Sequence, residues 1–128
     1  FFEENGYEAI FKGCDELTRT ETMAERKRVM EDSADAFVIV PGGIGTLEEL
    51  FEVLTLKQLG RHRKAIAIYN SCGFYTNFDA SLDEIISRKF VNEECRLLYK
   101  TLNEHREVAE YIENYTAEGL HWDLLKRN

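Results

Sequence analysis

The sequence is poor in proline and cysteine and has no long apolar run, and each shortage excludes a class of protein. A single proline, Pro41, and the absence of Ser/Gly-rich tracts leave no linker, so we expect one domain over residues 1–128. Three cysteines without a CxxC pair or a histidine at ligand spacing argue against a disulfide framework and a zinc site, and favour a reducing compartment. No apolar run approaches the roughly 20 residues of a membrane helix, and the first residues do not resemble a signal peptide. We therefore expect a cytoplasmic protein with no membrane partner, whose natural start lies before Phe1.

Acidic side chains outnumber basic ones by eight, because 24 aspartates and glutamates face 16 lysines and arginines. This excess argues against sequence-independent binding of nucleic acid, which depends on neutralising phosphates. It leaves room for a small anionic ligand, since a local group of backbone amides and guanidiniums can hold a phosphate within an acidic protein. Hydrophobic residues make up 44% of the chain, enough for a core, which excludes wholesale disorder.

The apolar pattern predicts strands and helices in alternation, which is typical of an α/β fold with a mainly parallel sheet. The continuous apolar run at 36–40 indicates a strand covered on both faces. Ligands bind such sheets at the carboxyl ends of the strands, here the loops 41–46 and 70–74. The expected elements are a short strand at 15–19, a helix at 23–34, strands at 36–40, 64–69 and 97–101, helices at 46–59 and 74–90, and a last helix capped by Asn103 with Val108, Tyr111, Ile112 and Tyr115 facing inward.

The loop Pro41-Gly-Gly-Ile-Gly-Thr46 leaves the first apolar strand and opens a helix that Gly60 is expected to end. Glycines let an anion approach the backbone, and the free N–H groups of a helix start favour a phosphate. The loop is neither a Walker A sequence nor a GxGxxG dinucleotide fingerprint. A purely structural alternative stays open, in which Thr46 is the N-cap and Glu49 reaches back to its N–H as a capping box.

The segment Met23-Ala-Glu-Arg26-Lys27-Arg28 places three cations on the preceding helix. Taken alone, it indicates a solvated helix face, with Lys27 and Glu31 at i,i+4. Its pairing with the glycine loop changes this interpretation.

Met23-x-x-Arg26-Lys27, followed by Pro41-Gly-Gly-x-Gly-Thr-x-x-Glu49, resembles the paired motifs of the LONELY GUY (LOG) family, as does Asn70-x-x-Gly-Phe-Tyr75. Members are cytokinin riboside 5′-monophosphate phosphoribohydrolases, often labelled lysine decarboxylase-like. The resemblance runs from near residue 1 to about residue 115. It implies a Rossmann-like three-layer α/β/α domain, of which this chain would be the larger, C-terminal part without the first strands.

The resemblance also implies a reaction and the residues that carry it. A nucleoside 5′-monophosphate, either AMP or a cytokinin riboside 5′-monophosphate, would be cleaved to free base and ribose 5-phosphate. Glu49 would stabilise the sugar cation or orient water, as carboxylates do in glycoside hydrolysis, and Arg26 would bind the leaving base or the phosphate. The expected substrate- and phosphate-binding residues are Lys27, Gly42, Gly43, Gly45, Thr46 and Thr55.

Thr55 has a simpler alternative, a mid-helix hydroxyl bonded to a carbonyl one turn back. No metal or cofactor is expected, and the family implies a homodimer with its sites near the subunit boundary. The competing function is a non-catalytic nucleotide or cofactor carrier on the same scaffold, similar to molybdenum-cofactor carrier proteins. The presence of both Arg26 and Glu49 favours the enzyme, because a carrier needs no paired acid and guanidinium. Lysine decarboxylation is rejected, since nothing marks a Schiff-base lysine within a phosphate site.

Overall fold

The structure, a computed structural model, describes residues 22–125, and the strand expected at 15–19 lies outside this range. Two compact units follow one another along the chain, Phe1–Ala34 and Asp35–Asn128. In the first unit, helix α2 (Met23–Ser33) confirms the expected helix. It begins after Thr22, whose hydroxyl accepts a hydrogen bond from the Glu25 N–H at 3.0 Å and so acts as N-cap. The single domain expected over residues 1–128 stays a prediction.

The second unit is built on a parallel sheet with strand order β1-β2-β3, which confirms the predicted α/β class. Ala36 of β1 pairs with Ala65 of β2, and Ala67 of β2 pairs with Lys100 of β3. The elements in chain order are β1 (Ala36–Ile39), α3 (Ile44–Gln58), β2 (Ala65–Tyr69), the 3₁₀ turn η1 (Ser71–Gly73), α4 (Thr76–Ser87), the 3₁₀ helix η2 (Glu93–Leu97), β3 (Lys100–Leu102), α5 (His105–Glu113) and α6 (Trp122–Leu125).

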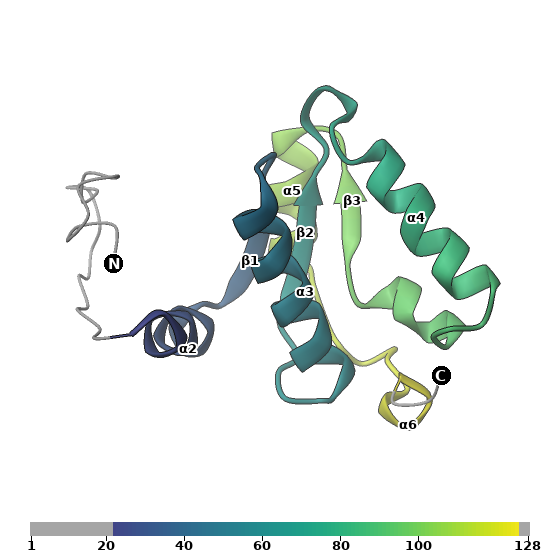
Figure 1. Ribbon diagram of the computed structural model, residues 1–128, viewed down its shortest axis with the longest axis horizontal. Helices are drawn as coiled ribbons and strands as arrows, with labels where there is room; N and C mark the ends of the chain where they lie inside the picture. The colour runs from purple at the N-terminus through teal and green to yellow at the C-terminus, as the bar shows by residue number, and fades with distance from the viewer. Residues whose placement is uncertain (1–21, 126–128) are drawn as a thin grey trace. The chain divides into compact units, whose positions relative to one another are not determined.

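Alternating side chains of the central strand β2 point to two different cores. Ile66 and Ile68 are fully buried against α3 and α4, whereas Ala67 packs against Leu102 and Val108 of β3 and α5. Figure 1 shows α3 in front of the sheet and α5 behind it. The second unit is therefore a three-layer α/β/α arrangement, as the family resemblance implied.

The edge strand β1 is less covered than its apolar sequence predicted. Val38 is 46% exposed and Val40 is 51% exposed, whereas Ile39 is buried under α3. The expectation of cover on both faces is wrong for the described residues, because α5 packs mainly on β2 and β3 and the Val38 face of β1 stays half-exposed.

The segment before α5 also differs from the sequence prediction. Residues 93–97 form η2 because Asn92 caps it, its side chain accepting from the Glu94 N–H at 2.9 Å, so the third strand begins three residues later than expected. Asn103 is not the N-cap of α5. That position belongs to Glu104, and the Asn103 side chain accepts a hydrogen bond from Asn70 instead.

Helix α3 ends as predicted, with Gly60 just beyond it at a φ of +78°, which glycine adopts without strain. Its last turn buries Lys57 completely. The Lys57 ammonium donates to the Leu98 carbonyl at 2.8 Å and lies 4.5 Å from the centroid of the Tyr115 ring. Burial lowers the pKa of Lys57 to about 8.

Among the described residues, no helix has the length and hydropathy to cross a bilayer.

Candidate functional site

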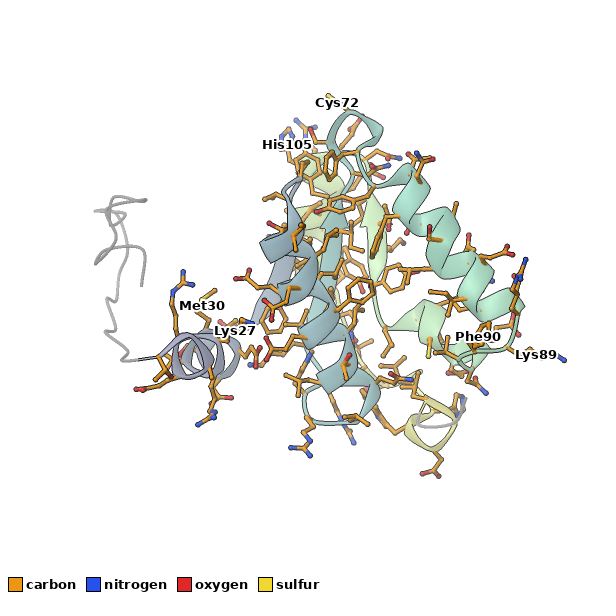
Figure 2. The ribbon with its side chains drawn as sticks, in the orientation of Figure 1. Lys27, Met30, Cys72, Lys89, Phe90 and His105 are labelled. Atoms are coloured by element: carbon orange, nitrogen blue, oxygen red, sulfur yellow. The ribbon has the colours of Figure 1, made fainter. Side chains whose placement is uncertain are left out.

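Because the three strands are parallel, their carboxyl ends lie at one edge of the sheet, where the loops into α3, α4 and α5 begin. This edge carries the glycine loop, the Asn70–Tyr75 turn and Asn103. Figure 2 places Cys72 of η1 and His105 of α5 at the same edge. In an open parallel sheet, this edge is the usual position of a ligand.

Helix α3 begins two residues earlier than expected, with Gly43 as N-cap and Ile44 as its first residue. Thr46 is therefore inside the first turn, and the capping box of Thr46 and Glu49 is wrong. The N-cap is a glycine, so it offers no side-chain hydrogen bond to the first amides of the helix. These N–H groups and the positive end of the helix dipole face the exposed loop, as an anion site requires.

Packing requires glycine at one of the positions 42, 43 and 45 but not at the other two. A Cβ on Gly42 would lie 2.2 Å from the Thr46 hydroxyl oxygen, so close packing explains that glycine. A Cβ on Gly43 or Gly45 would meet nothing within 4 Å, and neither residue has a positive φ. Neither packing nor backbone strain in the described part of the chain therefore calls for glycine at 43 or 45.

Glu49 lies one turn further along α3 and is half-buried. No residue of the described range forms a hydrogen bond or an ion pair with its carboxylate, which also makes no cap. Because Glu49 is half-buried and its carboxylate has no partner among the described residues, its charge is available to a ligand at this edge. Its environment thus differs from that of an ordinary capping glutamate.

Arg26 and Lys27 lie on α2, in the first compact unit, where both are half-buried and each has an interaction partner. Figure 2 labels Lys27 on this helix. Glu49 and the glycine loop belong to the second unit. The convergence of Arg26 and Glu49 on one substrate stays a prediction.

Thr55 is exposed and lines an apolar groove of about 160 Å³ between α3, α4 and η2. It is nine residues beyond Thr46, about 13 Å along the helix at a rise of 1.5 Å per residue. The structure does not bring it to the glycine loop within one chain. A second cavity, of about 570 Å³, lies between the start of β3 and the end of α5 and contains none of the predicted site residues.

His62 has a structural role. Its Nε2 donates to the Val53 carbonyl at 2.9 Å, and its Nδ1 accepts from the Lys64 N–H at 3.1 Å. Within residues 22–125, no three His, Cys, Asp or Glu side chains are arranged to hold a metal ion.

Sequence reasoning missed the contacts made by Asn70, Tyr75 and Asn103 at this edge. The Tyr75 hydroxyl donates to the Val40 carbonyl at 2.6 Å, and the Asn70 amide bonds both Tyr75 and Asn103. The one sequence feature that pointed to these contacts is Asn70, an asparagine directly after a buried strand. An asparagine at that position usually indicates a solvated turn, so the sequence did not predict a buried hydrogen-bonded side chain.

The chain is similar in sequence to a known family and to several proteins with assigned names. A family described as possible lysine decarboxylase matches residues 3–112. The chain is 41% identical over 111 residues to the cytokinin riboside 5′-monophosphate phosphoribohydrolase LOG of Oryza sativa subsp. japonica, covering 84% of this chain and 46% of that protein. It is 35% identical over 118 residues to the enzyme named LOG7 of Arabidopsis thaliana, covering 88% and 54%. A protein of the same enzyme name from Mycobacterium marinum is 47% identical over 79 residues, covering 62% and 42%.

The chain spans about half the length of the curated relatives it matches. The family match, however, covers most of its 128 residues. On this evidence the chain belongs to the LOG family, the group described as possible lysine decarboxylases.

Proposed function

We propose that the full-length protein hydrolyses the N-glycosidic bond of a nucleoside 5′-monophosphate, either AMP or a cytokinin riboside 5′-monophosphate. The products are the free base and ribose 5-phosphate. The names of the relatives support this reaction class. The observation that carries the proposal is the start of α3, where two glycines that the described part of the fold does not require precede half-buried Glu49, whose carboxylate has no partner among residues 22–125.

In the proposed reaction the bond between ribose C1′ and the base nitrogen breaks, and its electron pair leaves with the base. Water adds its oxygen to C1′, and its proton neutralises the base. Glu49 stabilises the positive charge that develops at C1′ or orients the attacking water. Arg26, with Lys27 beside it, supplies positive charge to the leaving base or the phosphate. These steps need no metal or cofactor.

The 5′-phosphate binds at the first turn of α3 in this proposal. The amides around Gly43 and Gly45 supply donors, the Thr46 hydroxyl supplies a further one, and Gly42 lets Thr46 pack closely behind the loop. The positive end of the helix dipole favours the phosphate charge. The phosphate thereby orients the sugar toward Glu49.

Gly45→Ala should change stability and substrate affinity in opposite directions. Gly45 is the second residue of α3 and has room for a methyl group, so alanine should raise the free energy of unfolding by about 0.5–1 kcal/mol. The same methyl group should obstruct a phosphate lying on the backbone and raise KM for AMP by about tenfold, the equivalent of one lost polar contact. Urea denaturation and initial-rate kinetics measure the two effects.

Gly119→Ala is the matched control, because a Cβ there also meets nothing within 4 Å and the residue lies far along the chain from the loop. It should leave KM unchanged. A Gly45→Ala enzyme that is more stable yet binds AMP like the wild type would contradict the phosphate cradle.

We propose further that the protein is a cytoplasmic homodimer that associates through the outer face of α3. Among the described residues, Cys72 and Cys95 are free thiols, which is the usual state of cysteine in the cytoplasm. The described range supports the interface in that Ile44, Phe51 and Leu59 lie on one face of α3 and are 88%, 45% and 46% exposed. Thr55 lies on the same face, so its proposed substrate contact would be made at the subunit boundary.

Phe51→Glu should convert the full-length dimer to a monomer, since two carboxylates would face each other across the proposed interface. Sedimentation equilibrium measures the change, which should be a rise of at least about 100-fold in the dimer dissociation constant. Leu97→Glu is the control, because Leu97 is 51% exposed but lies on η2 beside the other cavity. Dissociation by Leu97→Glu and not by Phe51→Glu would place the interface elsewhere.

The proposed reaction is tested by incubating the full-length protein with AMP and with isopentenyl-AMP and following the free base by chromatography. Release of adenine or isopentenyladenine, with ribose 5-phosphate in equal amount, supports the enzyme. A preference for the isopentenyl substrate would assign the protein to cytokinin formation. Binding of AMP without any release of base would instead favour the non-catalytic carrier.

A further inference from the structure

Tyr75 connects the glycine loop to the rest of the sheet edge. Its side chain is 1% exposed, and its ring lies between Phe74 and Phe78, with centroids at 4.9 and 5.8 Å. The only polar group of the side chain is its hydroxyl, which donates a hydrogen bond to the Val40 carbonyl at 2.6 Å. Val40 is the residue directly before the loop, so this bond fixes the point at which the glycine loop leaves β1.

Asn70 holds Tyr75 in turn. The Asn70 side chain is buried, and its oxygen accepts the Tyr75 N–H at 2.6 Å. Its amide nitrogen donates to the Asn103 oxygen at 3.1 Å and to the Thr76 hydroxyl at 3.3 Å. Its own backbone N–H donates to the Leu102 carbonyl at 2.7 Å. Every polar group of this side chain is used.

These bonds form one continuous path across the sheet edge, from Asn103 after β3, through Asn70 after β2 and Tyr75 before α4, to Val40 after β1. The path matters because β1 is an edge strand of the described sheet and because two glycines, Gly42 and Gly43, lie between β1 and α3, whose freedom makes ordering costly. Backbone donors must be held in place before a ligand arrives if they are to bind it tightly.

We propose that Tyr75 is a positioning residue that holds the glycine loop in its phosphate-binding conformation through the Val40 carbonyl, with Asn70 fixing Tyr75. The proposal rests on the proposed function, because it takes the phosphate of a nucleoside 5′-monophosphate as the ligand of the loop. Tyr75 bonds the backbone of the residue directly before the loop, and its effect on the substrate is exerted through that backbone.

Tyr75→Phe in the full-length protein tests the path, since phenylalanine keeps the buried ring and removes only the hydroxyl. Amide hydrogen exchange over residues 41–47 should be at least about tenfold faster than in the wild type, with exchange in β2 unchanged. Calorimetric titration should show AMP binding weakened by about tenfold and adenosine binding unchanged, because only AMP carries the phosphate. Asn103→Ala, which removes one acceptor of Asn70 from an exposed position, should shift both readouts in the same direction by a smaller factor.

The matched control is Tyr115→Phe. The Tyr115 hydroxyl is also buried but has no hydrogen-bond partner within the described range, and it lies just after α5, against Lys57 in the last turn of α3. It should leave loop exchange and both affinities unchanged. Unchanged exchange over 41–47 in Tyr75→Phe, or equal weakening of AMP and adenosine, would overturn the positioning role. A wild-type protein that does not bind AMP would overturn the proposed function, and the exchange result would still decide whether Tyr75 holds the loop.

Discussion

Glu49→Gln should lower the rate of base release from AMP by about 1,000-fold in the full-length protein, the range expected for loss of a group that activates water or stabilises developing charge. Glutamine keeps the length and hydrogen-bonding capacity of the side chain but cannot carry the negative charge that opposes the sugar cation. The effect should fall on kcat, with KM changed little, because the charge at C1′ exists only in the transition state. Single-turnover measurement of free adenine separates this step from product release.

The same change should leave folding intact. Glu49 neither caps α3 nor pairs with a residue in the described range, and glutamine has nearly the helix propensity of glutamate. The thermal midpoint should therefore stay within about 2 °C of the wild type. Glu107→Gln, the same change in the first turn of α5, is the control and should retain full activity. Undiminished turnover in Glu49→Gln would remove Glu49 from the mechanism.

The Arg26→Ala variant tests whether Arg26 on α2 and Glu49 on α3 act on the same substrate. It should also lower base release to a small residual rate, with the fold retained. If Arg26 and Glu49 act on the same sugar phosphate, the double variant should be no slower than the slower single variant, because residues that act as a unit are not additive. If instead the rate loss of the double variant equals the product of the two single losses, Arg26 stabilises α2 and does not take part in the reaction.

Periodicity alone predicted most of the second unit because its buried residues are strongly patterned. Ile66 and Ile68 alternate with Ala65 and Ala67 in a run that could only be a covered strand, and Gly60 marks the end of α3. Two of the errors fall where a local polar contact decides the outcome. Asn92 caps η2 and so delays β3, and the Asn103 side chain accepts from Asn70 and so does not cap α5.

The candidate site was predictable only as a set of residue types. Its motif identified the glycine loop and Glu49, but a threonine three residues before a glutamate also fits a capping box, and the sequence contains nothing to decide between the two. The backbone decides it, because α3 begins at Ile44 and leaves Glu49 without a capping role. The two longest-range bonds of the path through Asn70 and Tyr75 join residues 33 and 35 positions apart, which no local pattern can predict.

Titration of Lys57 should make the stability of the protein depend strongly on pH. Its folded pKa, about 8, is below the ordinary 10.5, so the folded protein releases this proton at a lower pH than the unfolded chain. Between these values the unfolded chain binds more protons, and stability must rise with pH. From pH 7.5 to 9.5 the free energy of unfolding should rise by about 2 kcal/mol more in the wild type than in Lys57→Met, which has no group to titrate there. Urea denaturation at the two pH values measures the difference, and parallel pH dependences in the two proteins would refute it.

Lys57→Ala should differ sharply from Lys57→Met at neutral pH. Methionine fills the buried volume and removes a charge that is costly to bury, so its net effect should be within about 1 kcal/mol of the wild type. Both variants leave the Leu98 carbonyl without its ammonium donor, but alanine also leaves a cavity beside Tyr115 and should cost about 3 kcal/mol or more. Because Lys57 anchors the last turn of the helix whose first turn forms the glycine loop, a stable Lys57→Met protein should also keep its affinity for AMP. Loss of AMP binding in that stable variant would show that the loop depends on the charge of Lys57 as well as on the packing of α3.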